Sequence, residues 1–184
     1  MAAYAIMQNI HAVIYIFGAG FSFVIAANIS GLLVVQEVKS AQRRAIVSIV
    51  AMFFIGILLS VIMYFLKNEI SSLFTNDWLT QLHHEDLLRI YVYMTPFVLV
   101  EQVMIGIAKA IGRERVYVCI DICMIFIFQF GCIALMFGNN GLGYELVWYS
   151  RFISLLLMIM FGFTVIMYAT DWDEKALEVK RTVD

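Results

Sequence analysis

Consecutive apolar positions, rather than a one-sided pattern, dominate the chain. Residues 45–66 form a run of 22 positions without a charged side chain. About 20 apolar residues in a helix span the hydrocarbon core of a bilayer, and a helix in a soluble domain rarely needs apolar side chains on every face. Four further segments are similar, so the pattern predicts five transmembrane helices, at about 5–33, 45–66, 88–110, 116–137 and 145–169.

The composition agrees with this prediction. The 184-residue chain is 63% hydrophobic and 14% charged, with a mean hydropathy of +0.90, whereas soluble domains are about half apolar and a quarter charged. Short connections make neighbouring helices antiparallel. We therefore predict an all-α integral membrane bundle within a lipid bilayer. It forms a single domain over residues 1–184 that ends in a tail at 170–184.

Several classes of function find no support in the residues. The net charge of −2 and the lack of a basic, aromatic-rich stripe argue against a nucleic-acid partner. The three cysteines lie in one apolar segment with no histidine nearby in sequence, which is too poor a set for a zinc site. The sequence offers no nucleophile–base pair and no phosphate-binding loop. It predicts a protein that is not an enzyme and that holds neither a metal nor another cofactor.

Lysine and arginine are distributed unevenly between the predicted connections. They gather in the first connection (Lys39, Arg43, Arg44), the third (Lys109, Arg113, Arg115) and the tail (Lys175, Lys180, Arg181). Acidic residues outnumber them in the second connection, and the glycine-rich turn at 138–143 has no charge. Since Lys and Arg favour cytoplasmic loops, we expect the N-terminus outside and the C-terminus in the cytoplasm. The expected location is the plasma membrane.

Glu101 is the most deeply placed ionisable residue, near the middle of the third span. Such a group costs at least about 2.5 kcal/mol at the bilayer centre, so it needs a physical reason to be there. Gln102 follows it, and Pro96, five residues before it, predicts a helix kink that opens space for a cation or a water. Two interpretations stay open: a carboxylate that binds a proton or cation, or a protonated Glu hydrogen-bonded to a neighbouring helix.

Other polar residues also lie within the predicted spans. Asp121 is expected to reach the cytoplasmic interface or to pair with a basic residue of the third connection. Arg151 can extend outward along its span or pair with Glu145 or with the carboxylate of the third span. Asn9 and His11 are expected to form an interhelical hydrogen bond, and Asn9 is also a candidate ligand.

Small residues recur every four positions in two spans. They are Ser22, Ala26 and Ser30 in the first span, and Gly106 and Ala110 in the third. Small side chains at this spacing let helix backbones approach closely within a membrane. The pattern predicts tight packing in both spans and carries no information about a substrate.

Short motifs follow one another along nearly the whole chain. They are Ala19-Gly20-Phe21-Ser22, Ala41-Gln42-Arg43-Arg44-Ala45, Ile70-Ser71-Ser72-Leu73-Phe74-Thr75-Asn76-Asp77, Gly106-Ile107-Ala108-Lys109-Ala110-Ile111-Gly112-Arg113, and Gly141-Leu142-Gly143 before Trp148. In this order the sequence resembles helices eight to twelve of the multidrug and toxic compound extrusion (MATE) family. The resemblance implies most of the second of two six-helix lobes. Even-numbered helices of that family run from outside to inside, as charge indicates for the first span here.

The resemblance also implies a function. MATE proteins are antiporters that expel drugs and other organic cations in exchange for H⁺ or Na⁺. Carboxylates that some members carry in helices eight and ten correspond here to Asn9 and Val98. Glu101 lies three residues after Val98 on nearly the same helical face, so the resemblance makes it the expected substitute. Asp121 stands where the family often has Asn early in helix eleven.

A membrane protein that does not transport is the alternative. A single lobe does not enclose the central cleft that alternating access requires. A truncated half or a partial gene product would therefore need a second lobe, supplied by another chain or by a second copy in a homodimer.

Overall fold

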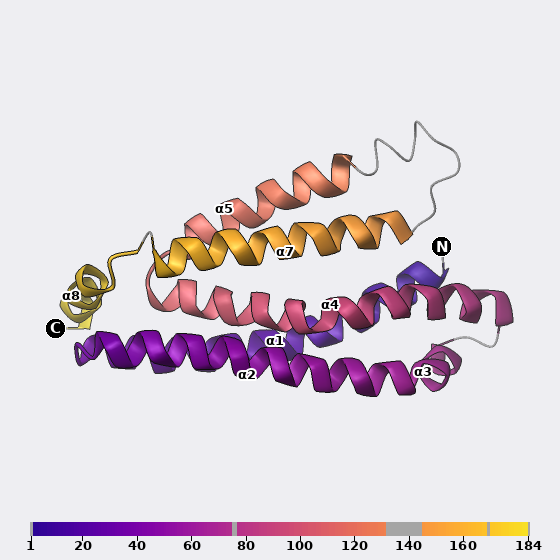
Figure 1. Ribbon diagram of the computed structural model, residues 1–184, viewed down its shortest axis with the longest axis horizontal. Helices are drawn as coiled ribbons and strands as arrows, with labels where there is room; N and C mark the ends of the chain where they lie inside the picture. The colour runs from indigo at the N-terminus through magenta and orange to yellow at the C-terminus, as the bar shows by residue number, and fades with distance from the viewer. Residues whose placement is uncertain (1, 75–76, 132–144, 169, 184) are drawn as a thin grey trace.

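The computed structural model describes residues 2–74, 77–131, 145–168 and 170–183, and these residues form helices without a strand (Figure 1). The elements in chain order are α1 (Ala2–Val34), α2 (Val38–Phe65), α3 (Lys67–Phe74), α4 (Trp78–Ala110), α5 (Glu114–Ile125), the π-helical η1 (Phe126–Phe130), α7 (Glu145–Met167) and α8 (Trp172–Val183).

Four of the described helices, α1, α2, α4 and α7, are long and apolar enough to cross a membrane. They correspond to four of the five predicted spans, and the predicted all-α membrane bundle is confirmed. α5 and η1 cover the first part of the span predicted at 116–137. Residues 132–137 and the glycine-rich turn at 138–143 lie outside the described residues, so the span at 116–137 stays a prediction.

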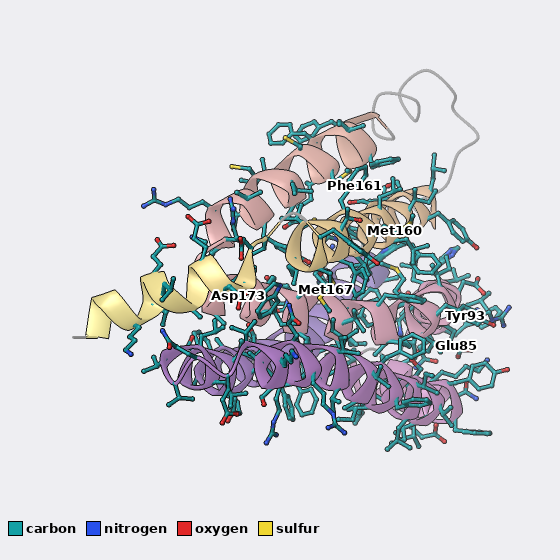
Figure 2. The ribbon with its side chains drawn as sticks, turned by 60° about the vertical axis from the view of Figure 1, so that its left-hand side comes forward. Glu85, Tyr93, Met160, Phe161, Met167 and Asp173 are labelled. Atoms are coloured by element: carbon teal, nitrogen blue, oxygen red, sulfur yellow. The ribbon has the colours of Figure 1, made fainter. Side chains whose placement is uncertain are left out.

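α4 is the central helix of the bundle, with α1, α2 and α7 around it (Figure 1). In its most apolar 18-residue window 83% of the residues are buried, against 17% for α1, 22% for α2 and 28% for α7. The outer helices leave large apolar side chains at the surface, among them Met160 and Phe161 of α7 (Figure 2). The fold therefore shields most of α4 from its surroundings, while apolar surfaces of the other helices stay open to lipid.

Glycines bring the backbones around α4 close together. A Cβ atom added to Gly106 of α4 would lie 2.5 Å from the carbonyl oxygen of Ser22 in α1. A Cβ atom added to Gly56 of α2 would lie 2.4 Å from the Cα atom of Pro96. No side chain fits in such contacts, so the close packing predicted for Ser22 and Gly106 is confirmed.

Pro96 lies inside α4, which continues through it to Ala110. Proline has no amide hydrogen, so it leaves the carbonyl of Val92, four residues earlier, without its helical donor. The hydroxyl of Ser60 in α2 donates to this carbonyl at 2.7 Å. α2 therefore supplies the hydrogen bond that proline removes, beside the Gly56 contact.

The connection before α4 contains the short helix α3 and then Asp77, which caps α4. The Asp77 carboxylate accepts hydrogen bonds from the side-chain hydroxyl and from the backbone amide of Thr80. These bonds hold the pKa of Asp77 below its ordinary value of 3.8, because they favour the charged carboxylate. The cap sets the start of α4 at Trp78, ten residues before the predicted span at 88–110.

The ends of the bundle differ in charge. The α1–α2 connection, the α4–α5 connection and α8 lie at one end, whereas the N-terminal end of α1 and α3 lie at the other (Figure 1). The first three segments are the ones rich in Lys and Arg. The predicted tail contains α8, which is held to α7 by a hydrogen bond of 2.9 Å from Trp172 Nε1 to the Ile166 carbonyl.

Candidate functional site

Arg151 of α7 lies between two carboxylates from two other helices. Its Nη2 atom is 3.7 Å from Oε1 of Glu101 in α4, and its Nη1 atom is 3.8 Å from Oδ1 of Asp121 in α5. Both distances are within the range of an ion pair and are longer than a direct hydrogen bond. The three residues, which we call the charge cluster, bring together polar groups from three helices of the bundle.

The charge cluster is largely removed from solvent. The side chain of Glu101 is 3% exposed, that of Arg151 14% and that of Asp121 30%. Transferring an ion into such an interior costs several kcal/mol, so each charge needs a compensating partner. With both carboxylates ionised, the cluster holds two negative charges and one positive charge. Its net charge is then −1, so the binding of one proton or one monovalent cation makes it neutral.

Several buried polar atoms around the cluster have no hydrogen-bond partner within the described residues. They are Glu101 Oε2, Gln102 Nε2, Tyr117 OH, Asp121 Oδ1, Arg151 Nη1 and Ser154 Oγ. An unpaired buried polar group costs about 1–3 kcal/mol. Such groups are uncommon in folded proteins, and several together in one region are typical of a site that binds ions or water.

A polar pocket of about 240 Å³ leads from the end of the bundle that carries the N-terminus to Arg151. It lies between α1 and α7 and is lined by Tyr4, Gln8, His11, Val147, Trp148 and Arg151. His11 Nδ1 lies 3.1 Å from the Tyr91 hydroxyl, and the rings of both residues pack edge-on against Trp148. Arg151 is thus shared between the pocket and the charge cluster.

The structure brings together some of the sequence-predicted residues and separates others. Glu101, Asp121 and Arg151 form the cluster. Among the described residues Asp121 pairs with Arg151 and not with a basic residue of the α4–α5 connection, so the pairing expected for Asp121 is wrong. Gln102 is buried against Gly18 of α1, where an added Cβ would lie 2.7 Å from the Gln102 Cγ atom. Asn9 is exposed on α1, away from the buried core.

Of the pocket residues, sequence reasoning named Arg151 as a candidate and His11 only as a partner in an interhelical hydrogen bond, and it missed Tyr4 and Gln8. Tyr4, Gln8 and His11 follow one another at spacings of four and three, which places them on one face of a helix. This polar face in an otherwise apolar span was the signal that could have found them. Trp148 lies one turn before Arg151 and had no such signal, because a tryptophan near a span end also fits a membrane interface.

The model of the MatE family matches residues 1–135, which is more than half of the chain and includes Glu101 and Asp121. The chain belongs to the MatE family. This confirms the resemblance drawn from the short motifs, and it makes the chain a multi-pass membrane protein of a family of efflux transporters, which are not enzymes. Arg151 lies beyond the matched segment of this MatE chain. No curated protein matches it.

Proposed function

We propose that this MatE chain takes part in cation-coupled efflux, in which H⁺ or Na⁺ binds at Glu101 and organic cations are the exported species. The observation that carries the proposal is the charge cluster, with two carboxylates facing one guanidinium inside the bundle. One bound H⁺ or Na⁺ neutralises the cluster. The binding of a single cation therefore changes the electrostatic energy of the bundle interior at a place where charges are poorly screened.

In the proposed cycle, Glu101 Oε2 receives the coupling cation, because this oxygen is buried and lacks a partner among the described residues. Arg151 keeps the unloaded cluster stable by its attraction to both carboxylates. A state that opens the cluster to water favours release of the cation, and a closed state favours the neutral cluster. Two conformations with different affinity for the cation are the thermodynamic requirement for coupling.

The remaining candidate residues have supporting roles in this proposal. Asp121 shares the charge of Arg151, and Gln102 offers a buried amide next to Glu101. Pro96 supplies a hinge in α4, at the point where Ser60 replaces the missing helical hydrogen bond. Asn9 is a candidate contact for the exported cation, because its side chain is exposed on α1.

We also propose an outward N-terminus, a cytoplasmic α8 and a plasma-membrane location. The gathering of the basic segments at one end of the bundle supports this orientation (Figure 1). The exposed apolar side chains of α1, among them Phe17 and Phe23, offer a surface for a second lobe or for a second copy of this chain. Native mass spectrometry tests this assembly: a purely monomeric protein in mild detergent would contradict it.

The test of the function is transport in proteoliposomes. The purified chain is reconstituted, and export of a fluorescent organic cation is followed under an imposed pH gradient or Na⁺ gradient. We expect Glu101→Gln to abolish gradient-driven export. Glu85→Gln is the matched control, since Glu85 is a partly exposed carboxylate of the same helix that pairs with Lys67 at 3.6 Å.

Each outcome of this experiment has a clear meaning. Loss of export in Glu101→Gln together with normal export in Glu85→Gln supports the proposal. Equal export by the wild type and Glu101→Gln refutes the role of Glu101. The absence of gradient-driven export by the wild type refutes cation-coupled efflux by this chain and favours a membrane protein that does not transport.

A further inference from the structure

A second pocket lies at the opposite end of the bundle from the polar pocket beside Arg151. It has a volume of about 400 Å³ and is lined by Leu32, Glu37, Ser40, Arg43, Arg44 and Val47. The connection between α1 and α2 forms it. Gln36 adopts a φ of 60°, and the amide of Glu37 donates to the Leu32 carbonyl at 2.9 Å, which turns the chain sharply from one helix into the next.

Four of the lining residues lie on one face of α2. Ser40, Arg43, Arg44 and Val47 follow at intervals of three, one and three residues, which is the spacing of one helical face. This face differs from the one that contains the buried Ala41 and Ala45. The side chains of Ser40, Arg43 and Arg44 are therefore free to bind a molecule outside the bundle.

Both arginines are exposed and uncompensated. No acidic side chain in the part of the chain that the structure describes lies within 4.0 Å of either guanidinium. Arginine presents several donors in a planar arrangement that matches phosphate oxygens. Ser40 adds a hydroxyl donor in the same wall of the pocket. With the carboxylate of Glu37 included, the lining carries a net charge of +1, which suits a monoanion.

The pocket also has apolar walls. Val47 lies within the uncharged run of residues 45–66 and is 55% exposed, and Leu32 faces the pocket from the last turns of α1. The polar groups thus lie at the level where α2 enters its apolar span, and the apolar groups lie toward the hydrocarbon. An anion without an acyl chain would contact only the polar groups of the pocket and not its apolar wall.

We propose that this pocket binds an anionic phospholipid, with the phosphate at Arg43 and Arg44 and an acyl chain along Val47. Charge complementarity and the amphipathic lining together point to a lipid rather than to a soluble phosphate. Glu37 accepts a hydrogen bond from a hydroxyl or ammonium group of the headgroup, which its position beside the arginines allows. The pocket shares no lining residue with the charge cluster.

The proposal is tested by native mass spectrometry of the full chain, incubated with phosphatidylglycerol or phosphatidylcholine in detergent. We expect bound phosphatidylglycerol in the wild type. In the double variant Arg43→Gln/Arg44→Gln we expect binding about 30-fold weaker, from the loss of two basic side chains near an anionic group. The matched control is Lys175→Gln/Arg115→Gln, which removes the same charge at the same end of the bundle, outside the pocket.

Four results would overturn the proposal. They are equal binding of the two lipids, equal loss in the control variant, unchanged binding in the pocket variant, and displacement of the lipid by millimolar inorganic phosphate. The last result would indicate a site for a soluble anion. The charge-retaining variant Arg43→Lys/Arg44→Lys is the control for misfolding, and we expect it to keep most of the preference for phosphatidylglycerol.

Discussion

The charge cluster makes a quantitative prediction about Arg151. Replacing Arg151 by Gln removes the positive charge that lies 3.7 Å from Glu101 and 3.8 Å from Asp121. The two carboxylates then lie in the interior with no ion-pair partner among the described residues. Breaking a buried ion pair by removal of one partner typically destabilises a protein by about 3–5 kcal/mol, so we expect Arg151→Gln to reduce the free energy of unfolding by an amount in this range.

The size of the pairwise contribution follows from the geometry. Two unit charges 3.7 Å apart attract by about 4.5 kcal/mol at an effective dielectric constant of about 20. The contact between Arg151 and Glu101 is longer than a hydrogen bond, and Arg151 is shared with Asp121, so the net coupling is smaller. We expect a coupling free energy of about 2 kcal/mol, within the range measured for charged residues in contact.

A double-mutant cycle measures this coupling. The wild type, Arg151→Gln, Glu101→Gln and the double variant are unfolded by sodium dodecyl sulfate in mild detergent, at one fixed pH and salt concentration. We expect the double variant to be about 2 kcal/mol more stable than the sum of the single changes predicts. Arg151→Gln combined with Glu85→Gln is the control and should be additive. A coupling below about 0.5 kcal/mol between Arg151 and Glu101 would refute this interpretation of the cluster.

Three further predictions concern the helix contacts and the start of α4. Gly106→Ala should destabilise the bundle by about 1–3 kcal/mol, because the added Cβ would meet the backbone of Ser22. Gly20→Ala, which has open space around it, is the control and should be neutral or slightly stabilising in the same unfolding assay. Ser60→Ala should cost about 1 kcal/mol, since the carbonyl freed by the proline loses its donor; an unchanged unfolding midpoint would contradict this. Hydrogen bonds hold the pKa of Asp77 below 3.8, so its cap stabilises α4 fully above that pH and is lost as the pH falls through the lower folded pKa. The protection of the first-turn amides of α4 against hydrogen exchange should therefore fall there in the wild type and not in Asp77→Asn.

Four of the five spans were predictable because a bilayer requires long uncharged helices, which length and hydropathy identify. The pairing of Arg151 was not. Sequence reasoning left outward extension, Glu145 and Glu101 as alternatives, because a helix that is apolar on every face does not indicate its rotation about its own axis. That rotation is set by packing contacts, such as Gly162 of α7 beside the Tyr117 ring, where an added Cβ would lie 2.6 Å away. Contacts of this kind decide that Asp121 and Glu101 face the same guanidinium.

The central position of α4 also follows from the requirements of the bilayer. The trend is the reverse of that in soluble proteins, since the least apolar of the four long helices is the buried one. α2 has the highest hydropathy of the four long helices, 2.9, and only 22% of its most apolar window is buried. α4 has the lowest, 1.6, and 83% of its window is buried. In lipid, apolar side chains gain nothing by leaving the surface, whereas polar groups must be shielded and paired. The span that carries Glu101, Gln102 and Pro96 is therefore the one that the other helices surround. Hydropathy thus distinguishes the central helix from the lipid-facing ones, because the least apolar span has the most to gain from burial.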